Sequence, residues 1–590
     1  MKQIWATLRV SLQLQRGRLS LAVIAMAGRA VVLVFTPWPL KYIVNVSILG
    51  KAAPNWLERI ATDRWALLYL LGAAMLAFAT ADAMLDYLSN HLVLQAGQRA
   101  VTALRRKVFA HLLVLPLSWH RHRRGGDVMT RLSEDVGRMQ DLVVVVGTGL
   151  IPHIFTVLGM LCMMAVIDWR YGLMVAAVIP ALAFVSDRWS RKLRVRVRAA
   201  RHGDGDLWSM AQETLAAIPL VQAHGRERYE TRRFARLARR SLERALTASR
   251  AQAELPPLIN FLAGIATAAI TIYGAACVLD GSLTAGDLLL FLAYLRGLVT
   301  PVRQMTKNGP VVGRAVVAIE RIRELLDETV AIADPDNLVD APPGTGHLEF
   351  RSVSFSYDAD AAALENVSFH LAPGRRVALV GPTGAGKSTI AALTARLADP
   401  TSGAVLLDGR DLRTLRLQQV RRRVALMLQD APLLHGTVWE NIAYGRPGAG
   451  RDAAIDAAIA ADVDEILSNL PNGYDTVVAE RGASLSGGQR QCVAIARATL
   501  SNADVVILDE PSSSLDATTE RRISKALARL TASRASLTIA HRLITVRGAD
   551  EILVLKHGRI VQRGDHATLL REGGVYAGLL RSQSGSGIAA

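Results

Sequence analysis

Apolar residues form long runs in the first half of the chain, whereas the second half alternates short apolar runs with polar segments. A helix needs about 20 mostly apolar residues to cross the hydrocarbon core of a membrane. The fourth of the candidate segments is short, so we expect it to extend into its flanks, and Pro37 and Pro39 should kink or end the first. The pattern predicts an all-α transmembrane domain of six helices: Leu19–Val44, Trp65–Leu88, Leu142–Ile167, Tyr171–Val185, Pro257–Leu279 and Leu288–Val312.

Two of the connections between these segments are long. Val93–Leu113 and Asp204–Ala248 mix apolar and charged residues at helical spacing, with few Gly or Pro breakers. We therefore expect the membrane helices to continue well beyond the bilayer. Turn-like segments around His120–Gly125 and Ala216–Val221 are expected at the far tips.

The 590 residues have a formal net charge of +18, which by itself suggests nucleic acid or a membrane surface as a partner. Residues 1–345 contain 41 Lys and Arg against 26 Asp and Glu, whereas residues 346–590 contain 28 against 25. In the first half the basic residues gather in the two long connections. The positive-inside rule then places the N-terminus, both long connections and everything after residue 312 in the cytoplasm. The charge is thus mainly a topology signal, and we expect no nucleic-acid partner.

The composition changes after residue 312. We expect a transmembrane domain over 1–312 and a linker over 313–345, where amphipathic Arg314–Asp327 precedes a stretch rich in Pro, Gly and Asp. Short strand patterns follow at 348–350, 353–357 and 377–380, and they predict an α/β domain over 346–582. The remaining residues, 583–590, are expected to form a flexible tail.

The strand pattern at 377–380 runs directly into a phosphate-binding loop of the form G-x-x-x-x-G-K-S. Its glycines let backbone N–H groups close around phosphate oxygens, and the following helix adds the positive end of its dipole. Lys387 should reach the β- and γ-phosphates of a nucleotide, and Ser388 should ligate Mg²⁺. The residues predicted to bind the nucleotide here are Gly381, Pro382, Thr383, Gly384, Ala385, Gly386, Lys387, Ser388 and Thr389.

A second motif could supply the metal and water chemistry. The apolar run 505–508 ends in Asp509 and Glu510, as expected of a buried parallel strand whose carboxyl end reaches the site. We expect Asp509 to hold Mg²⁺ through water. Glu510 is the candidate that polarises the attacking water.

A third motif, Leu485-Ser486-Gly487-Gly488-Gln489, precedes a predicted helix and lies upstream of the Asp509-Glu510 strand. It resembles the signature of ATP-binding-cassette (ABC) proteins. The resemblance implies that Ser486, Gly487, Gly488 and Gln489 contact ATP. It also implies roles for four single residues that would otherwise be unremarkable: Tyr357 stacks on adenine, Gln429 senses Mg²⁺ and water, Asp516 belongs to the D-loop, and His541 is the switch histidine. Together with Glu510, Gln429 and His541 form the expected catalytic set.

The resemblance extends over nearly the whole chain, because six spans followed by one cassette resemble a bacterial exporter-type half-transporter of the type IV fold. It implies an ABC ATPase that uses ATP and Mg²⁺, and coupling helices at the tips of the long connections. In this architecture the phosphate loop of one cassette faces the signature of another, so two chains are needed. A homodimer is favoured because the predicted catalytic residue and the signature are both intact, and a heterodimer stays possible.

The predicted function is ATP-driven export or flipping of a small amphipathic or acidic substrate across the bacterial inner membrane. The alternatives are import by the same fold, or a non-transporting ABC ATPase, which the six spans disfavour. Charges inside spans are costly and usually functional or paired. Arg29 in the first span and Arg296, Arg303 and Lys307 on one face of the last are therefore candidates for a substrate cavity. Ion pairs with Asp82, Asp86 or neighbouring helices are the structural alternative.

Overall fold

The computed structural model describes residues 15–585 except 52–53, 61–62, 124, 335–339, 341–343, 359–360, 480–481, 510–516 and 541–545. The chain divides into two compact units. The first, which contains residues up to 111 and 126–327, is helical. The second contains residues 112–125 and 328 onward, and it includes the sheets.

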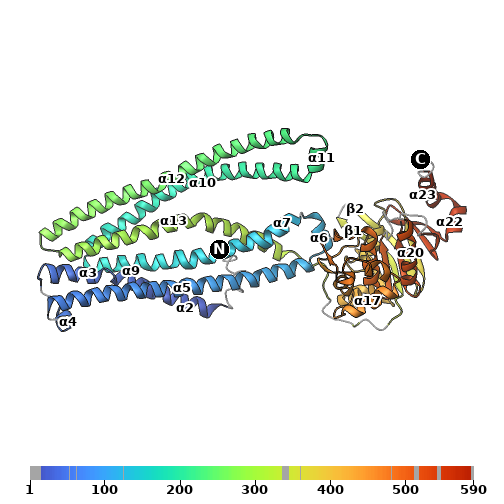
Figure 1. Ribbon diagram of the computed structural model, residues 1–590, viewed down its shortest axis with the longest axis horizontal. Coiled ribbons are helices and arrows are strands. Elements are labelled where there is room, and N and C mark those ends of the chain that lie inside the picture. Colours follow the sequence, from blue (N-terminus) through green and yellow to red (C-terminus); the bar gives the residue numbers. More distant parts are fainter. Residues whose placement is uncertain are drawn as a thin grey trace. The chain divides into compact units, whose positions relative to one another are not determined.

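Three helices of about 50 residues dominate the helical unit, and shorter helices complete it. The antiparallel helices α10 and α12 pack along each other and are joined by the short helix α11 (Figure 1). The helices up to residue 327, of which α6 belongs to the second unit, are α2 (Arg16–Phe35), α3 (Trp38–Tyr42), α4 (Asn55–Glu58), α5 (Arg64–Val114), α6 (Leu117–His122), α7 (Gly125–Thr130), α8 (Val136–Val144), α9 (Ile151–Ile167), α10 (Trp169–Ala216), α11 (Ile218–Ala223), α12 (Glu227–Leu279) and α13 (Ala285–Asp327), with π-helical turns η1 (Ile43–Ile48), η2 (Arg131–Asp135) and η3 (Val145–Leu150).

Four helical stretches within the described residues are long and apolar enough to cross a membrane. They are Arg16–Ile48, Arg64–Val114, Gly126–Ile167 and Glu227–Leu279. The expected fourth and sixth spans fall inside α10 and α13, which run without a break through both segments. As expected, the helices continue past the apolar segments: α12 alone has 53 residues, about 80 Å at 1.5 Å per residue.

Prolines set several of the helix boundaries. Helix α2 ends at Phe35, and Pro37 and Pro39 lie at the start of α3, which agrees with the predicted break. The turns expected at the tips of the long connections are short: Ala217 separates α10 from α11, and α6 ends at His122. Short helices, α6 and α11, occupy the rest of both tips. Pro116 directly precedes α6 and Pro219 lies in the first turn of α11, where a missing N–H costs nothing and the fixed φ favours a helix.

A polar clasp joins the first and last membrane helices within the helical unit, and it consists of Lys41, Asn45, Thr284 and Asp287. Lys41 Nζ lies 2.6 Å from Asp287 Oδ1, and Asn45 donates to Thr284 Oγ1 at 2.9 Å. Gly286 N donates to Asn45 Oδ1 at 2.9 Å, and a Cβ on Gly286 would lie 2.7 Å from the Asn45 amide. The close approach of these helices therefore requires glycine at this position.

The cassette, residues 346–585, contains two main sheets and one short antiparallel pair of strands, β7 and β8. An antiparallel sheet has the order β2-β1-β4-β5, and a six-stranded sheet has the order β12-β11-β3-β10-β9-β6, parallel except for β12. The two stretches predicted as separate strands at 348–357 form one strand, β1, with register shifts. The strands are β1 (Leu348–Asp358), β2 (Ala361–Leu371), β3 (Arg376–Val380), β4 (Ser402–Leu407), β5 (Arg410–Asp411), β6 (Val424–Met427), β7 (Gly436–Thr437), β8 (Val477–Val478), β9 (Val505–Asp509), β10 (Ala535–Ile539), β11 (Glu551–Lys556) and β12 (Arg559–Gly564).

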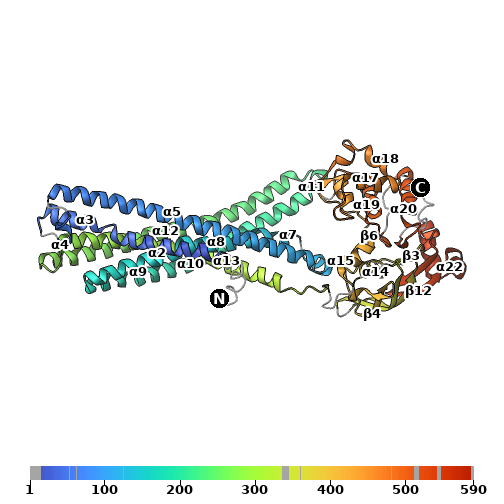
Figure 2. The same ribbon diagram turned by 90° about the horizontal axis from the view of Figure 1, so that it is seen from below.

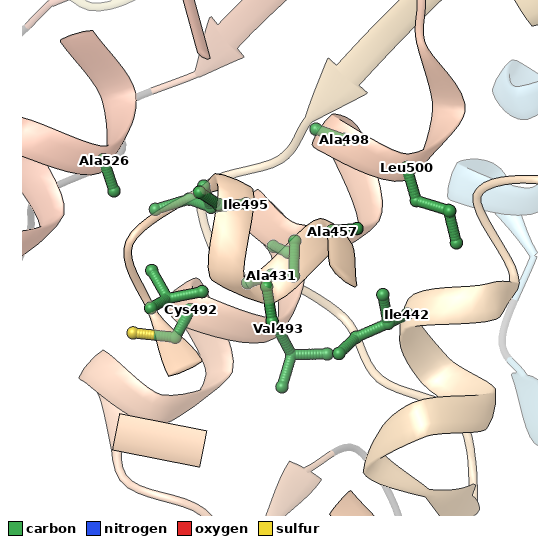
Figure 3. Packing of buried hydrophobic residues seen from close by; sticks show 14 of the residues in the cluster. Ala431, Ile442, Ala457, Cys492, Val493, Ile495, Ala498, Leu500 and Ala526 are labelled. Atoms are coloured by element: carbon green, nitrogen blue, oxygen red, sulfur yellow. The ribbon is translucent and has the colours of Figure 1, made fainter. Parts of the chain in front are cut away.

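Helices pack around these sheets and divide the cassette into separate hydrophobic cores (Figure 2). One core lies between the two sheets and includes Phe350, Leu379 and Ile507. Another surrounds α19, where Cys492, Val493 and Ile495 pack against neighbouring helices (Figure 3). The helices are α14 (Lys387–Thr394), α15 (Leu417–Arg423), α16 (Val438–Ala443), α17 (Arg451–Ala460), α18 (Asp464–Ser468), α19 (Gly487–Ser501), α20 (Ala517–Thr531), α22 (His566–Glu572) and α23 (Gly574–Gly585), with 3₁₀ turns η4 (Leu412–Thr414) and η5 (Gly473–Asp475).

Candidate functional site: a nucleotide-binding cassette

The predicted phosphate loop connects the buried strand β3 to helix α14, as its sequence requires. Lys387 begins α14 and is only 5% exposed, and its ammonium group donates to the carbonyls of Gly381 at 2.7 Å and Pro382 at 3.0 Å. The lysine is therefore folded over the loop that would hold the phosphates. A buried cation at the N-terminus of a helix creates a positive site suited to an anionic ligand.

Glycine is required at the ends of this loop. Gly386 has φ +105°, and a Cβ there would lie 2.6 Å from the carbonyl oxygen of Ala363. A Cβ on Gly381 would lie 2.2 Å from the carbonyl oxygen of Leu555. By contrast, Gly384 has φ +82° and open space around it. The loop thus takes its shape from close contacts with β2 and β11, and its middle stays accessible to a ligand.

Three side chains that the sequence assigns to the nucleotide site, Ser388, Thr389 and Tyr357, lie in or beside α14. Ser388 is exposed, whereas Thr389 is 6% exposed and its hydroxyl lies 3.3 Å from the hydroxyl of Tyr357. The Tyr357 ring is 41% exposed and packs edge-on against Phe355 with centroids 4.8 Å apart. An accessible, fixed aromatic face beside the phosphate loop is suited to stacking on a base.

Parallel pairing brings other predicted residues to the same edge of the sheet. In the six-stranded sheet, Ile539 of β10 pairs with Asp509 of β9, and Met427 of β6 pairs with Leu508. Asp509 ends β9, and Gln429 follows two residues after β6 and is exposed. Because β3 is parallel to these strands, its phosphate loop lies at the same carboxyl edge. The sheet therefore collects the loop, a carboxylate and an amide at one edge.

Three predicted residues of the catalytic and nucleotide sets, Glu510, Asp516 and His541, lie outside the described residues. Their roles stay predictions. Glu510 directly follows Asp509 in the chain, and His541 directly follows Ala540, the residue after β10.

The signature motif forms the start of α19. Ser486 is the N-cap, and its hydroxyl accepts from Gln489 N at 3.3 Å, while Ser486 N donates to Gln489 Oε1 at 2.8 Å. This reciprocal pair is a capping box. Gly488 is buried and Gly487 half-buried, so backbone N–H groups rather than side chains form the surface at this helix end. Sequence reasoning missed the capping role of Gln489, although the S-x-x-Q spacing contains the signal.

The candidate cavity residues differ in their surroundings. Arg29 Nε donates to Asp82 Oδ1 at 2.8 Å, and its NH1 group pairs with Asp86. Asn90, one turn further along α5, also donates to Asp86 at 3.0 Å. Arg296 is exposed on α13, whereas the side chains of Arg303 and Lys307 lie outside the described set.

Known proteins share this combination of helices and cassette. Residues 19–302 match the family model described as ABC transporter transmembrane region, and residues 364–513 match the model described as ABC transporter. An ATP-dependent lipid A-core flippase of Syntrophus aciditrophicus is 36% identical over 491 residues, which are 83% of this chain and 82% of that protein. One from Ralstonia nicotianae is 32% identical over 99% of this chain and 96% of its own length.

A solved structure has a similar fold over nearly the whole chain. A bacterial Atm1-family ABC exporter with ATP bound has a TM-score of 0.81 and 29% identity, over 96% of this chain and 98% of its own. The fold and site thus define a membrane-spanning nucleotide-binding protein. The chain belongs to the ABC transporter family, with an exporter-type membrane domain fused to its cassette. It is an ATPase whose hydrolysis is coupled to transport, as the sequence predicted.

Proposed function

We propose that the protein is a homodimeric flippase or exporter that moves an anionic, amphipathic lipid across the bacterial inner membrane. The observation behind this proposal is the end-to-end similarity to ATP-dependent lipid A-core flippases, which spans 99% of this chain in the Ralstonia nicotianae protein. A long acyl substrate needs an apolar path, and an acidic head group needs a cation. Among the cavity candidates whose side chains the structure describes, Arg29 is paired with aspartates, whereas Arg296 on α13 is exposed and could supply this cation.

Two chains are proposed because the halves of the nucleotide site belong to different parts of one cassette. Helix α14 follows the phosphate loop and packs in the core between the sheets, whereas α19 follows the signature and packs in the helical core (Figure 2). A second copy would bring its signature to the phosphate loop of the first. In each such site, Ser388 and Asp509 would hold Mg²⁺, directly and through water, with Gln429 near them. Mg²⁺ would neutralise developing phosphate charge during hydrolysis.

The proposal is tested by flux in liposomes. The purified protein is reconstituted with a fluorescent lipid A-core glycolipid, and movement between leaflets is followed with ATP and Mg²⁺ outside. Glu510→Gln should abolish movement, because the attacking water would lose its base. Arg296→Ala should bring the ratio of glycolipid-stimulated to basal ATPase towards one, while Arg314→Ala, on the same helix but outside the predicted span, serves as the matched control.

Two results would contradict the proposal. Full ATP turnover by the Glu510→Gln variant would show that Glu510 does not polarise the attacking water. Equal movement of an uncharged lipid and the anionic glycolipid, with an unchanged ratio in the Arg296→Ala variant, would remove the acidic substrate. For stoichiometry, a vanadate-trapped particle with the mass of one chain would exclude the dimer.

A further inference from the structure

Arg497 lies three turns into the signature helix α19 and fastens that helix to another part of the cassette. Its Nε donates to the backbone oxygen of Asn441 at 2.8 Å, and its NH2 group donates to the Asn441 side-chain oxygen at 3.3 Å. A third donor, NH1, reaches the carbonyl of Pro432 at 3.2 Å. All three acceptors belong to the segment 432–441, which follows Gln429 in the chain.

Asn441 extends this arrangement along the same segment. Its amide nitrogen donates to the carbonyls of Leu434 at 2.9 Å and Thr437 at 3.0 Å, and its oxygen accepts from Leu434 N at 2.9 Å. Asn441 is 4% exposed, so these bonds are shielded from water. The segment 432–437 is thereby fixed by one asparagine, which is itself held by one arginine.

The site requires the planar fork of arginine rather than a positive charge. Each of the three acceptors of Arg497 is an uncharged oxygen, and no carboxylate among the described residues forms an ion pair with it. Burial lowers the pKa of this guanidinium from its usual value, which marks a desolvated site. A Cβ on Gly445 would lie 2.4 Å from the Arg497 carbonyl, so the turn that follows α16 approaches the backbone of α19 closely here. Lysine carries all its N–H donors on one nitrogen, whereas the three bonds of Arg497 start from three separate nitrogens, so lysine cannot reproduce this geometry.

The segment that Arg497 holds lies beside exposed apolar side chains. Leu428 is 47% exposed, Leu434 57% and Tyr444 70%, and together they flank Gln429 and the fixed segment. The other end of α19 is the signature, 11 residues or about 16 Å before Arg497 at 1.5 Å per residue. A single helix therefore runs from the signature serine to the anchor of the segment.

We propose that Arg497 is a positioning residue that makes the signature helix and the segment 432–441 move as one body, so that nucleotide capture at the signature changes the exposed surface after Gln429. The inference rests on the proposed ATP-driven transport, in which the cassette must signal to the membrane domain. Arg497 touches neither nucleotide nor reacting atoms, and it acts through Asn441.

The test compares Arg497→Lys with Arg534→Lys in the full-length protein. Arg534 is also half-buried with its pKa lowered by burial, and it also donates to α19, at Ala498 O and Asn502 Oδ1, but it does not reach the segment. Hydrogen–deuterium exchange is measured with and without ADP–vanadate. In the empty Arg497→Lys variant, amides 433–437 should exchange about 5- to 30-fold faster, which corresponds to one or two lost net hydrogen bonds.

In the parent protein and in Arg534→Lys, trapping should slow exchange both at the phosphate loop and at 433–441. Trapping of Arg497→Lys should still slow exchange at the phosphate loop but no longer at 433–441. The ratio of substrate-stimulated to basal ATPase of this variant should approach one, while its KM for ATP stays within about two-fold of the parent value. Should Arg497→Lys fail to fold, Asn441→Asp replaces the two amide donors by a carboxylate oxygen that the carbonyls of Leu434 and Thr437 repel, while the acceptor for Arg497 stays; the segment should loosen and give the same separation.

The inference is overturned if both lysine variants equally lose the slower exchange at 433–441 on trapping, or if Arg497→Lys retains it. It is also overturned if trapping leaves 433–441 unchanged in the parent. Failure of the proposed function looks different, because the phosphate loop itself would then show no protection, or no lipid would stimulate the parent ATPase. The faster exchange of empty Arg497→Lys would remain measurable in either case.

Discussion

The ion pair of the polar clasp offers a direct measurement of how strongly the first and last membrane helices are joined. Lys41 and Asp287 have side chains that are only 16% and 11% exposed, so solvent screens their attraction weakly. We consider three variants: Lys41→Met, Asp287→Asn and the two combined. Each change keeps approximately the shape of the side chain while it removes its charge.

The arrangement around the pair sets the expected magnitude. Removing one partner of a buried ion pair costs about 3–5 kcal/mol, because the other charge is left uncompensated. Here each remaining charge keeps some compensation: Thr284 N still donates to Asp287 at 3.1 Å, and Lys41 Nζ lies 5.1 Å from the centroid of the Trp38 ring. We therefore expect each single variant to lose about 2 kcal/mol and the double variant about 1 kcal/mol, a coupling of about 3 kcal/mol.

The assay is reversible denaturant unfolding in lipid nanodiscs, followed by the tryptophan fluorescence of the membrane domain. Transport by each variant is recorded in parallel, so that a loss of function without a loss of stability is visible. Additive single effects, with the double variant near 4 kcal/mol, would refute the reasoning, because the two charges would then not interact. Single costs within about 0.5 kcal/mol would show that the pair is as weak as one on an exposed surface.

Three further outcomes concern the cassette. Gly386→Ala should lower affinity for a fluorescent ATP analogue at least ten-fold, since its Cβ would meet a backbone oxygen at 2.6 Å, whereas Gly384→Ala has open space and should lose less; equal losses would contradict this. Burial raises the pKa of Cys492 to about 12, so at pH 8 a maleimide should reach Cys492 only after the cassette unfolds, and labelling of the folded protein at Cys492 would contradict this. Arg423→Met should destabilise the cassette by about 2–4 kcal/mol in calorimetry, because two carboxylates lose their shared partner; an unchanged melting temperature would exclude that role.

The fold was largely predictable because its signals are local. Long apolar runs mark membrane helices, and the short run 505–508 marks a buried parallel strand, whatever the rest of the chain does. Contacts between distant segments have no such signal. The pairing of Arg29 with Asp82 and Asp86 joins residues 53 and 57 positions apart, and the sequence offered it only as one of several alternatives.

The candidate site shows the same division. The phosphate loop and the start of α19 are continuous motifs, and the structure has each of them in its expected strand–loop–helix or loop–helix setting. The anchor at Arg497 was not predicted, because its acceptors are mostly backbone oxygens and any residue type could supply them. A sequence motif shows where a particular side chain is needed. It does not show hydrogen bonds to backbone carbonyls, because every residue has one.

The prolines inside α12 give that helix a mechanical property. Pro256 and Pro257 interrupt its hydrogen-bond ladder at the junction between the apolar segment and the polar extension. The extension from Glu227 to this joint is about 43 Å long, so a bend of about 10° there moves its tip by about 7 Å. A small change of angle at these prolines would therefore displace the far end of α12 by more than one helical turn, which is about 5.4 Å in an α-helix.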